Sequence, residues 1–284
     1  MLRNYYALTK PGIIYGNAIT AAAGFFLAAK GEIDWKLMLM MLVGLSLVIA
    51  SGCVFNNYMD RDIDGRMERT KNRALPSGAV SPKAAIIFAG LLLFLGVIAL
   101  YFHTTNKALI AALVGFFVYV FLYTPLKRRT VYATLIGSIA GATPPVVGYA
   151  AVTNRFDSGA LILFLILVFW QMPHFYAIAI RRIKDYNDAS IPVLPITKGI
   201  YATKIQMALY IIGFIVASAM LTLFGYAGYL YFAVSTLLGL AWLWRSVRGF
   251  KTADNTLWAK KVFLFSLIVL TSLCVIIPID QLIK

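Results

Sequence analysis

Charged residues are scarce in this sequence. Asp, Glu, Lys and Arg together make up 13% of the 284 residues, whereas hydrophobic residues make up 61%. A soluble domain needs a far more polar surface, so this composition indicates a polytopic membrane protein. Cysteine is also scarce, and both copies, Cys53 and Cys274, lie in apolar runs. This argues against a disulfide framework and indicates small buried hydrophobic residues instead.

Acidic residues are the rarer of the two charged kinds. The chain has 11 Asp and Glu against 26 Lys and Arg, which gives a formal net charge of +15. Such a surplus can indicate nucleic-acid binding. Here, however, the basic residues lie in short loops between apolar runs, as they do in membrane proteins whose orientation they set. We therefore expect a lipid bilayer and no nucleic acid as a partner.

The sequence also lacks the features of a cleaved leader. The first apolar run begins at Pro11, and the residues before it have none of the Arg- and Ser-rich length of a mitochondrial presequence. We therefore expect a prokaryotic cell (inner) membrane rather than an organelle.

Nine apolar runs are long enough to cross a bilayer, which takes about 20 helical residues. We predict an all-α fold, a single domain over residues 1–284 built as a bundle of nine transmembrane helices. The span Thr130–Asn154 should be kinked or broken, because it contains Pro144 and Pro145. The other predicted spans are Pro11–Ala29, Leu37–Met59, Ala84–Phe102, Ala108–Leu126, Ser158–Ile180, the two parts of Ile205–Trp244 on either side of Gly225 and Gly228, and Val262–Ile279.

The orientation of the bundle follows from the positions of Lys and Arg, which collect in inside loops. With the N-terminus inside and the C-terminus outside, 21 of the 26 basic residues fall on the inside. Removing one span would disturb this alternation. We therefore predict nine spans with the N-terminus inside and the C-terminus outside.

A polar stretch follows the second span at its inside end. Asn56, Asp60 and Asp64 stand at i, i+4 and i+8, so a helix continued through them carries all three on one face. Two carboxylates and an amide oxygen suit Mg²⁺, which is bound by carboxylates together with substrate phosphates. Arg69 and Arg73 follow closely and could hold phosphate oxygens. We predict a magnesium and diphosphate site here, in preference to solvated loop charges.

A second inside loop carries a related set of residues. Asp185 and Asp188 are at i and i+3, so they could hold a second Mg²⁺ opposite the first, with Lys184 on a basic rim. Two cations that share one diphosphate would make it a better leaving group. The alternative is that Asp185 only pairs with Arg181 or Arg182.

Two further places carry polar candidates. Lys127 and Arg128 come first after the fourth span and could face the same diphosphate, although basic residues at a helix end often only set topology. His174 lies inside the sixth span, directly after Pro173. A buried polar residue in a membrane helix is costly and indicates function by default. The alternatives for His174 are a hydrogen bond to a neighbouring helix, ligation of haem iron and the lining of a cavity.

These motifs resemble those of the UbiA-type intramembrane prenyltransferase superfamily, whose pattern is Asn-Asp-x-x-Asp-x-x-x-Asp followed by Arg-Thr-x-x-Arg-Pro. Two positions depart from that pattern: Asn57 stands in place of Asp, and Ala74 in place of Pro. Asn57 is therefore only a secondary candidate for the metal site. Tyr123 and Lys127 match the Tyr-x-x-x-Lys motif of the superfamily. Over essentially the whole chain, the sequence is similar to the haem O synthase (protohaem IX farnesyltransferase) branch. That similarity is carried by Thr9–Gly12, Ser51–Asn57, Trp170–His174, Lys184–Tyr186 and Ile191–Pro195.

The resemblance implies a nine-helix bundle whose active site faces the cytoplasm. It implies transfer of the farnesyl group of farnesyl diphosphate to a vinyl group of haem B, with addition of water, giving haem O. It also implies a possible contact with a haem-copper oxidase assembly. The implied roles are Mg²⁺ binding by Asn56, Asp60, Asp64 and, at a reduced second motif, Asp185; diphosphate neutralisation by Arg69, Arg73, Lys127, Arg128 and Lys184; and haem placement by His174.

Two other functions fit parts of the sequence. A relative that prenylates a quinone precursor or another aromatic acceptor would share the metal site and differ in the acceptor pocket, where Trp170–His174 is the discriminating segment. A transporter is the other alternative. Transporters place ionisable groups near the membrane midplane at broken helices, whereas the charges here cluster at the inside ends of the spans.

Overall fold

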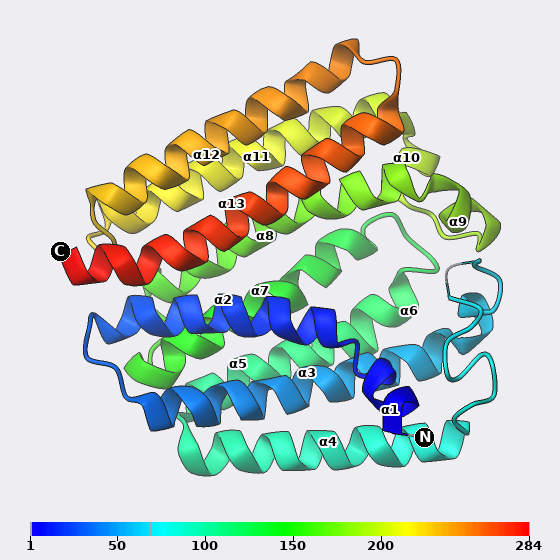
Figure 1. Ribbon diagram of the computed structural model, residues 1–284, viewed down its shortest axis with the longest axis horizontal. Coiled ribbons are helices and arrows are strands. Elements are labelled where there is room, and N and C mark those ends of the chain that lie inside the picture. Colours follow the sequence, from blue (N-terminus) through cyan, green and yellow to red (C-terminus); the bar gives the residue numbers. More distant parts are fainter. Residues whose placement is uncertain (1, 69, 284) are drawn as a thin grey trace.

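The computed structural model describes residues 2–68 and 70–283, and within those ranges every regular element is a helix (Figure 1). The elements are α1 (Leu2–Leu8), α2 (Pro11–Ala29), α3 (Trp35–Asp64), α4 (Pro82–His103), α5 (Asn106–Phe117), a π-helical segment (Val118–Tyr123), α6 (Thr124–Leu126), α7 (Ala133–Thr153), α8 (Ser158–Arg181), α9 (Ile183–Asp188), α10 (Leu194–Thr197), α11 (Gly199–Leu223), α12 (Tyr229–Val247), a 3₁₀ segment (Arg248–Lys251) and α13 (Asn255–Ile283).

The described residues contain nine helices that are long and apolar enough to cross a membrane, which confirms the predicted bundle. The predicted turn at Gly225 and Gly228 is also confirmed, because α11 ends at Leu223 and α12 begins at Tyr229. Figure 1 shows the two ends of the chain at opposite ends of the bundle. The short helices α1, α6, α9 and α10 gather at one of these ends, where the predicted site residues lie.

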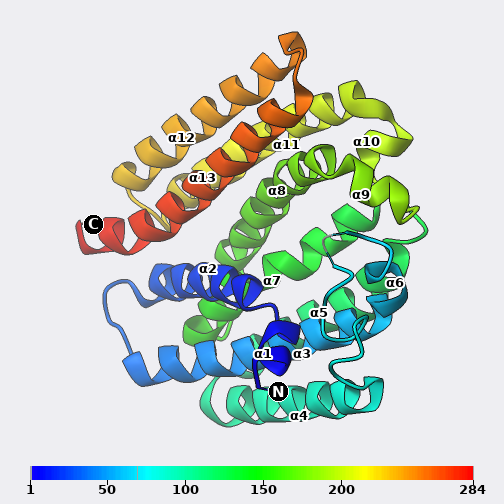
Figure 2. The same cartoon turned by 45° about the vertical axis from the view of Figure 1, so that its right-hand side comes forward.

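Helices α7 and α8 form the centre of the bundle. Helix α7 packs against α2, α5 and α8, and α8 packs in turn against α11 and α13. In Figure 2 the helices α11, α12 and α13 lie on one side of this pair, and α2, α3 and α4 lie on the other. The approach of α2 to α7 depends on glycine, because a Cβ added at Gly24 would overlap the backbone of Pro145, and one at Gly148 would overlap that of Ala21.

Helix α7 runs unbroken through Pro144 and Pro145, so of the predicted kink or break in this span the break is wrong. Proline removes the N–H that would bind the carbonyl four residues earlier, and for Pro144 that carbonyl belongs to Ala140. The hydroxyl of Thr143 donates to this carbonyl oxygen at 2.9 Å. A side chain thus takes over the hydrogen bond that the proline cannot make, and the helix continues.

A small hydrophobic cluster joins the two polar loops at the α9 end of the bundle. Ile63 and Met67, at the end of α3 and just after it, are buried against Ala189 and Ile191, which follow α9. The cluster brings the segment that carries Asp185 beside the end of α3. The fold therefore places both Asp-containing segments on the same side of the bundle.

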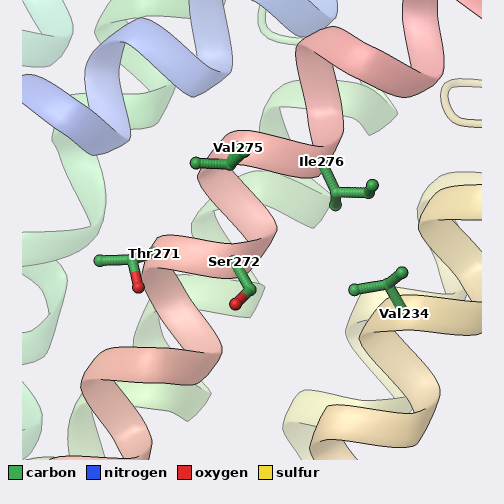
Figure 3. A pocket seen from close by; sticks show the side chains of 5 residues that line it. All are labelled: Val234, Thr271, Ser272, Val275 and Ile276. Carbon is green, nitrogen blue, oxygen red and sulfur yellow. The ribbon is translucent and has the colours of Figure 1, made fainter.

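A groove lies between α12 and α13 (Figure 3). It is lined by Val234, Thr271, Ser272, Val275 and Ile276. Helix α13 begins at Asn255, so Thr271 lies about 24 Å along the helix from that end, at 1.5 Å per residue. Its lining carries no charge, and the groove is not part of the candidate site.

Candidate active site

The predicted metal-binding face is an ordered part of α3. The helix continues through Asp64, as the i, i+4, i+8 spacing requires, and the side chains of Asn56, Asp60 and Asp64 are all buried. Two carboxylates buried next to an apolar wall would be costly without partners, because a charge loses its hydration there. The surrounding residues must therefore supply positive charge.

Two of the predicted diphosphate-binding residues supply that charge. Lys127 forms an ion pair with Asp60, and Arg73 donates to Oδ2 of Asp64 at 2.7 Å. Arg73 comes from the loop that follows α3, nine residues after Asp64, whereas Lys127 is 67 residues from Asp60 and meets it only in the fold. The site therefore contains carboxylates and cations in alternation, an arrangement that can exchange partners with a metal ion and an anion together.

The oxygen set of this face fits Mg²⁺. Oδ1 of Asp60 is buried and has no hydrogen-bond partner among the described residues, so it is an available ligand atom. Within the described part of the chain, no three His, Cys, Asp or Glu side chains come together as a ready metal cage. Asn56, Asp60 and Asp64 would hold Mg²⁺ with the remaining positions filled by water and phosphate oxygens, which is how this ion usually binds.

Lys10 also contacts this face, although the sequence indicated only an inside position for it and a place in the Thr9–Gly12 motif. Its Nζ donates to Oδ1 of Asn56 at 2.5 Å, and Nδ2 of Asn56 donates to Oγ1 of Thr124 at 3.0 Å. Lys10 stands in the left-handed region, with φ of 52°, where the chain turns from α1 into α2. Burial lowers the pKa of Lys10 to about 8. The signal that could have revealed it is a lone lysine placed directly before a helix-starting proline.

Asn57 has a structural role that explains its departure from the family pattern. Its Nδ2 donates to the carbonyl oxygen of Leu8 at 2.8 Å, and its Oδ1 accepts a hydrogen bond from Arg73 at 3.3 Å. A carboxylate could not donate to Leu8. Asn57 thus ties the end of α1 to the arginine that binds Asp64.

Arg128, predicted to face the diphosphate, binds Asp62, which is outside the predicted metal-binding set. Its guanidinium makes two hydrogen bonds of 2.8 Å to Asp62 and another to the carbonyl of Met59, and it lies 3.5 Å from Oδ1 of Asp60. The hydrogen bonds to Asp62 raise the pKa of Arg128. Asp62 is on the exposed side of α3, so Arg128 sits at the rim of the site.

The second loop contributes less than the first. Asp185 on α9 lies 3.9 Å from Arg182, and its Oδ2 is enclosed without a hydrogen-bond partner in the described structure. Lys184 and Asp188 are exposed. Arg69, predicted to bind diphosphate, lies outside the described residues.

His174 is buried in α8 and makes the interhelical hydrogen bond that was one of its alternatives. Its Nδ1 lies 2.7 Å from Oγ of Ser266 on α13. Its ring stacks on Trp170 with 4.5 Å between the ring centroids. His174 and the charged cluster are thus separate parts of the molecule, one within the spans and the other at their end.

A family model described as the UbiA prenyltransferase family matches residues 17–268. The chain belongs to this family. Its curated relatives include a protoheme IX farnesyltransferase of Yersinia pseudotuberculosis serotype O:1b and another of Cronobacter sakazakii. Each is 54% identical over 281 residues, which cover 99% of this chain and 95% of the relative.

Solved structures of UbiA homologues share the fold. A structure described as that of digeranylgeranylglyceryl phosphate synthase in membranes has a TM-score of 0.82 at 20% identity and covers 100% of this chain and 99% of its own. A UbiA homolog from Archaeoglobus fulgidus, bound to DMAPP and Mg²⁺, has a TM-score of 0.69 at 13% identity, covering 97% and 99%. These likenesses establish the architecture of the prenyltransferase bundle.

Proposed function

We propose that this UbiA-family prenyltransferase transfers the farnesyl group of farnesyl diphosphate to a vinyl group of haem B, with addition of water, giving haem O and diphosphate. The observation that supports this most directly is 54% identity over 99% of the chain to proteins named protoheme IX farnesyltransferase. The buried carboxylates of Asp60 and Asp64, with the half-buried Arg73 and Lys127 paired to them, are the group that would handle the diphosphate.

The diphosphate would lie against the basic side chains of this cluster. Lys10, Arg73 and Lys127 are directed at Asn56, Asp64 and Asp60 respectively. When bound, Mg²⁺ supplies positive charge to the leaving diphosphate oxygens. The basic side chains would then turn from the carboxylates to the phosphate oxygens. Neither the carboxylates nor the basic groups would be left unpaired in the apolar bundle. In this proposal Asp185 stands as a further metal ligand, and Arg69, Arg128 and Lys184 form a basic rim.

The transfer itself needs a dry and apolar surrounding. The carbon–oxygen bond of farnesyl diphosphate breaks, diphosphate leaves with the electron pair, and an allylic cation remains. The haem vinyl group forms the new carbon–carbon bond, and water then adds to the resulting cation and loses a proton. The apolar spans keep bulk water from the allylic cation. His174 would help to place the haem.

The location of the site follows from the predicted orientation. We infer that the protein is a multi-pass protein of the cell (inner) membrane, with its N-terminus and active site on the cytoplasmic side and its C-terminus outside. The farnesyl chain and the haem macrocycle are both lipid-soluble, so both substrates would enter from the bilayer. A haem-copper oxidase assembly is the proposed consumer of the product.

The test is an assay of purified protein in lipid nanodiscs with haem B, farnesyl diphosphate and Mg²⁺. The expected product is heavier than haem B by one farnesyl group plus one water. A parallel assay replaces haem B with a phenolic quinone precursor. Prenylation of the phenol without any change in haem would transfer the assignment to the aromatic-acceptor branch of the family. A farnesylated haem without the added water would refute only the hydration step.

A further inference from the structure

A hydrogen-bonded pair, His174 of α8 and Ser266 of α13, lies inside the spans. Nδ1 of His174 is 2.7 Å from Oγ of Ser266, which is fully buried. Trp170 supports both partners: its Nε1 donates to the carbonyl oxygen of Ser266 at 2.8 Å, and its ring stacks on the imidazole. Phe263 lies against the imidazole as well, with 4.8 Å between ring centroids. The orientation of the imidazole is therefore fixed by contacts from two helices.

The number of protons on the two groups fixes which of them is the donor in this hydrogen bond. The Ser266 hydroxyl has one proton, and it donates that proton to the carbonyl oxygen of Phe263 at 2.6 Å. A carbonyl oxygen can only accept. Oγ of Ser266 is therefore left to accept from His174, so that Nδ1 carries the ring proton. A neutral imidazole has a single N–H, and its Nε2 then holds a free lone pair.

Nε2 of His174 is not enclosed by the described residues. The structure gives Nε2 no hydrogen-bond partner among the described residues. Seven side-chain atoms of the described chain are enclosed without a partner, and Nε2 is not one of them. His174 as a whole is 8% exposed, and Nε2 contributes to that exposed part. A lone pair in an apolar span is thus left available to a ligand.

We propose that Ser266 is a positioning residue that holds His174 as the Nδ1–H tautomer and directs its Nε2 lone pair at the iron of a metalloporphyrin. The inference rests on the proposed function, because it takes the acceptor to be a haem. Ser266 itself does not touch the acceptor. Groups that accept the second N–H of a metal-binding histidine orient the ring and raise its basicity, and their loss costs about 10–100-fold in metal affinity or activity.

The tautomer can be read without any acceptor. The chain has two histidines, so the exposed one can be removed as His103→Gln, and ¹⁵N-histidine then reports His174 alone. In nanodiscs at neutral pH the proton is expected on Nδ1, and Ser266→Ala should populate the Nε2–H form. A wild-type ring protonated on Nε2 would overturn the proposal, whatever the acceptor is.

The role of the lone pair is tested by titration with haem B and with metal-free protoporphyrin IX. Ser266→Ala should weaken haem binding about tenfold and shift the Soret band of bound haem, with the affinity for metal-free porphyrin and for farnesyl diphosphate unchanged. Ser266→Thr, which keeps the hydroxyl, should behave as wild type. In the His174→Ala background, Ser266→Ala should have no further effect.

Each contrary result has a separate meaning. Equal losses for haem and for metal-free porphyrin would show that Ser266 only supports packing, and additive effects of the two substitutions would show that it does not act through His174. Either result overturns the inference and leaves farnesyl transfer intact. If the wild-type protein neither binds nor farnesylates haem, the proposed function fails with it.

Discussion

The carboxylates of Asp60 and Asp64 show what single residues contribute at the end of α3. Both are buried, and their partners Lys127 and Arg73 come from other segments of the chain. A buried charge that loses its only partner costs about 3–5 kcal/mol. In the proposed reaction, a magnesium diphosphate would bring a cation for the carboxylates and an anion for the basic side chains at once. This exchange would leave no charge unpaired.

The first residue-scale prediction concerns Asp64. Asp64→Ala should lower turnover about 100-fold or more at saturating Mg²⁺, by analogy with the loss of one electrostatic stabiliser from an active site. The matched control is Asp62→Ala on the same helix, because Asp62 is 54% exposed and binds Arg128 at the rim. Steady-state assays of both variants in nanodiscs test this. Near-normal turnover by Asp64→Ala would contradict the metal site.

Lys10 gives the second residue-scale prediction. Its half-buried Nζ donates to the amide oxygen of Asn56, and no described carboxylate forms an ion pair with it, so its charge is available to a diphosphate. Lys10→Met keeps the length and removes the charge. A hydrogen bond to a charged group contributes about 1.5–3 kcal/mol, so KM for farnesyl diphosphate should rise about tenfold or more, with little change for haem. The control is Lys83→Met, at an exposed lysine. Equal effects on both substrates would point to a loss of folding.

At the scale of elements, the central pair α7 and α8 shows how proline-containing helices stay continuous. Pro144 is compensated within α7 by Thr143, and the amide of Gln171 on α8 donates to the carbonyl oxygen of Ser138 on α7 at 3.1 Å. Polar side chains thus join the two helices where lipid offers no hydrogen bonds. Small residues let α2 approach α7 closely. This contact between the two helices positions Lys10, at the start of α2, beside Asn56.

The packing of α2 on α7 can be tested at one glycine. Gly148→Ala would put a Cβ into the backbone of Ala21, so the two helices must move apart. Overpacking of this kind typically costs about 1–3 kcal/mol, and the melting temperature should fall. The matched control is Gly90→Ala on α4, where no atom lies within 4 Å of the added Cβ. Equal melting temperatures for the two variants would mean that the seam is not tightly packed.

For the whole molecule, the hydropathy pattern was enough to predict most of the fold. The span Pro11–Ala29 was predicted to the residue, and all nine spans are present in the described chain. The predicted membrane span ends at Met59, and helix α3 continues for five residues beyond it to Asp64, as the predicted shared face of Asn56, Asp60 and Asp64 requires. The helix face that Asn56, Asp60 and Asp64 share was also predictable from their spacing alone.

What could not be read from the sequence are pairings between distant segments. Lys127 and Asp60 are 67 residues apart, and His174 and Ser266 are 92 apart. Hydropathy sets which segments cross the membrane, whereas these pairs depend on how the spans rotate and pack. Lys10 was missed for the same reason, since its burial is a property of the α1–α2 turn against α3.

The orientation of the whole bundle is the last prediction. The distribution of Lys and Arg, with 21 of the 26 on one side, predicts that the active site lies inside. Single cysteines in a Cys53→Ala, Cys274→Ala background should report this through an impermeant maleimide. Cysteines replacing Glu32 and Arg155, both exposed, should be labelled in intact cells. Glu32 is preferable to its neighbour Gly31, whose φ of 92° disfavours a side chain.

Cysteines replacing the exposed Lys71 and Asn187, which flank the site, should be labelled only after the membrane is permeabilised. Both sit in the loops joined by the Ile63–Ile191 cluster, so they must report the same side as each other. If the cysteines at positions 71 and 187 were labelled in intact cells and the cysteine at position 32 were not, the bundle would have the opposite orientation. The diphosphate site would then lie outside. Labelling of Lys71 and Glu32 positions from one side would instead mean that α3 does not cross the bilayer between them.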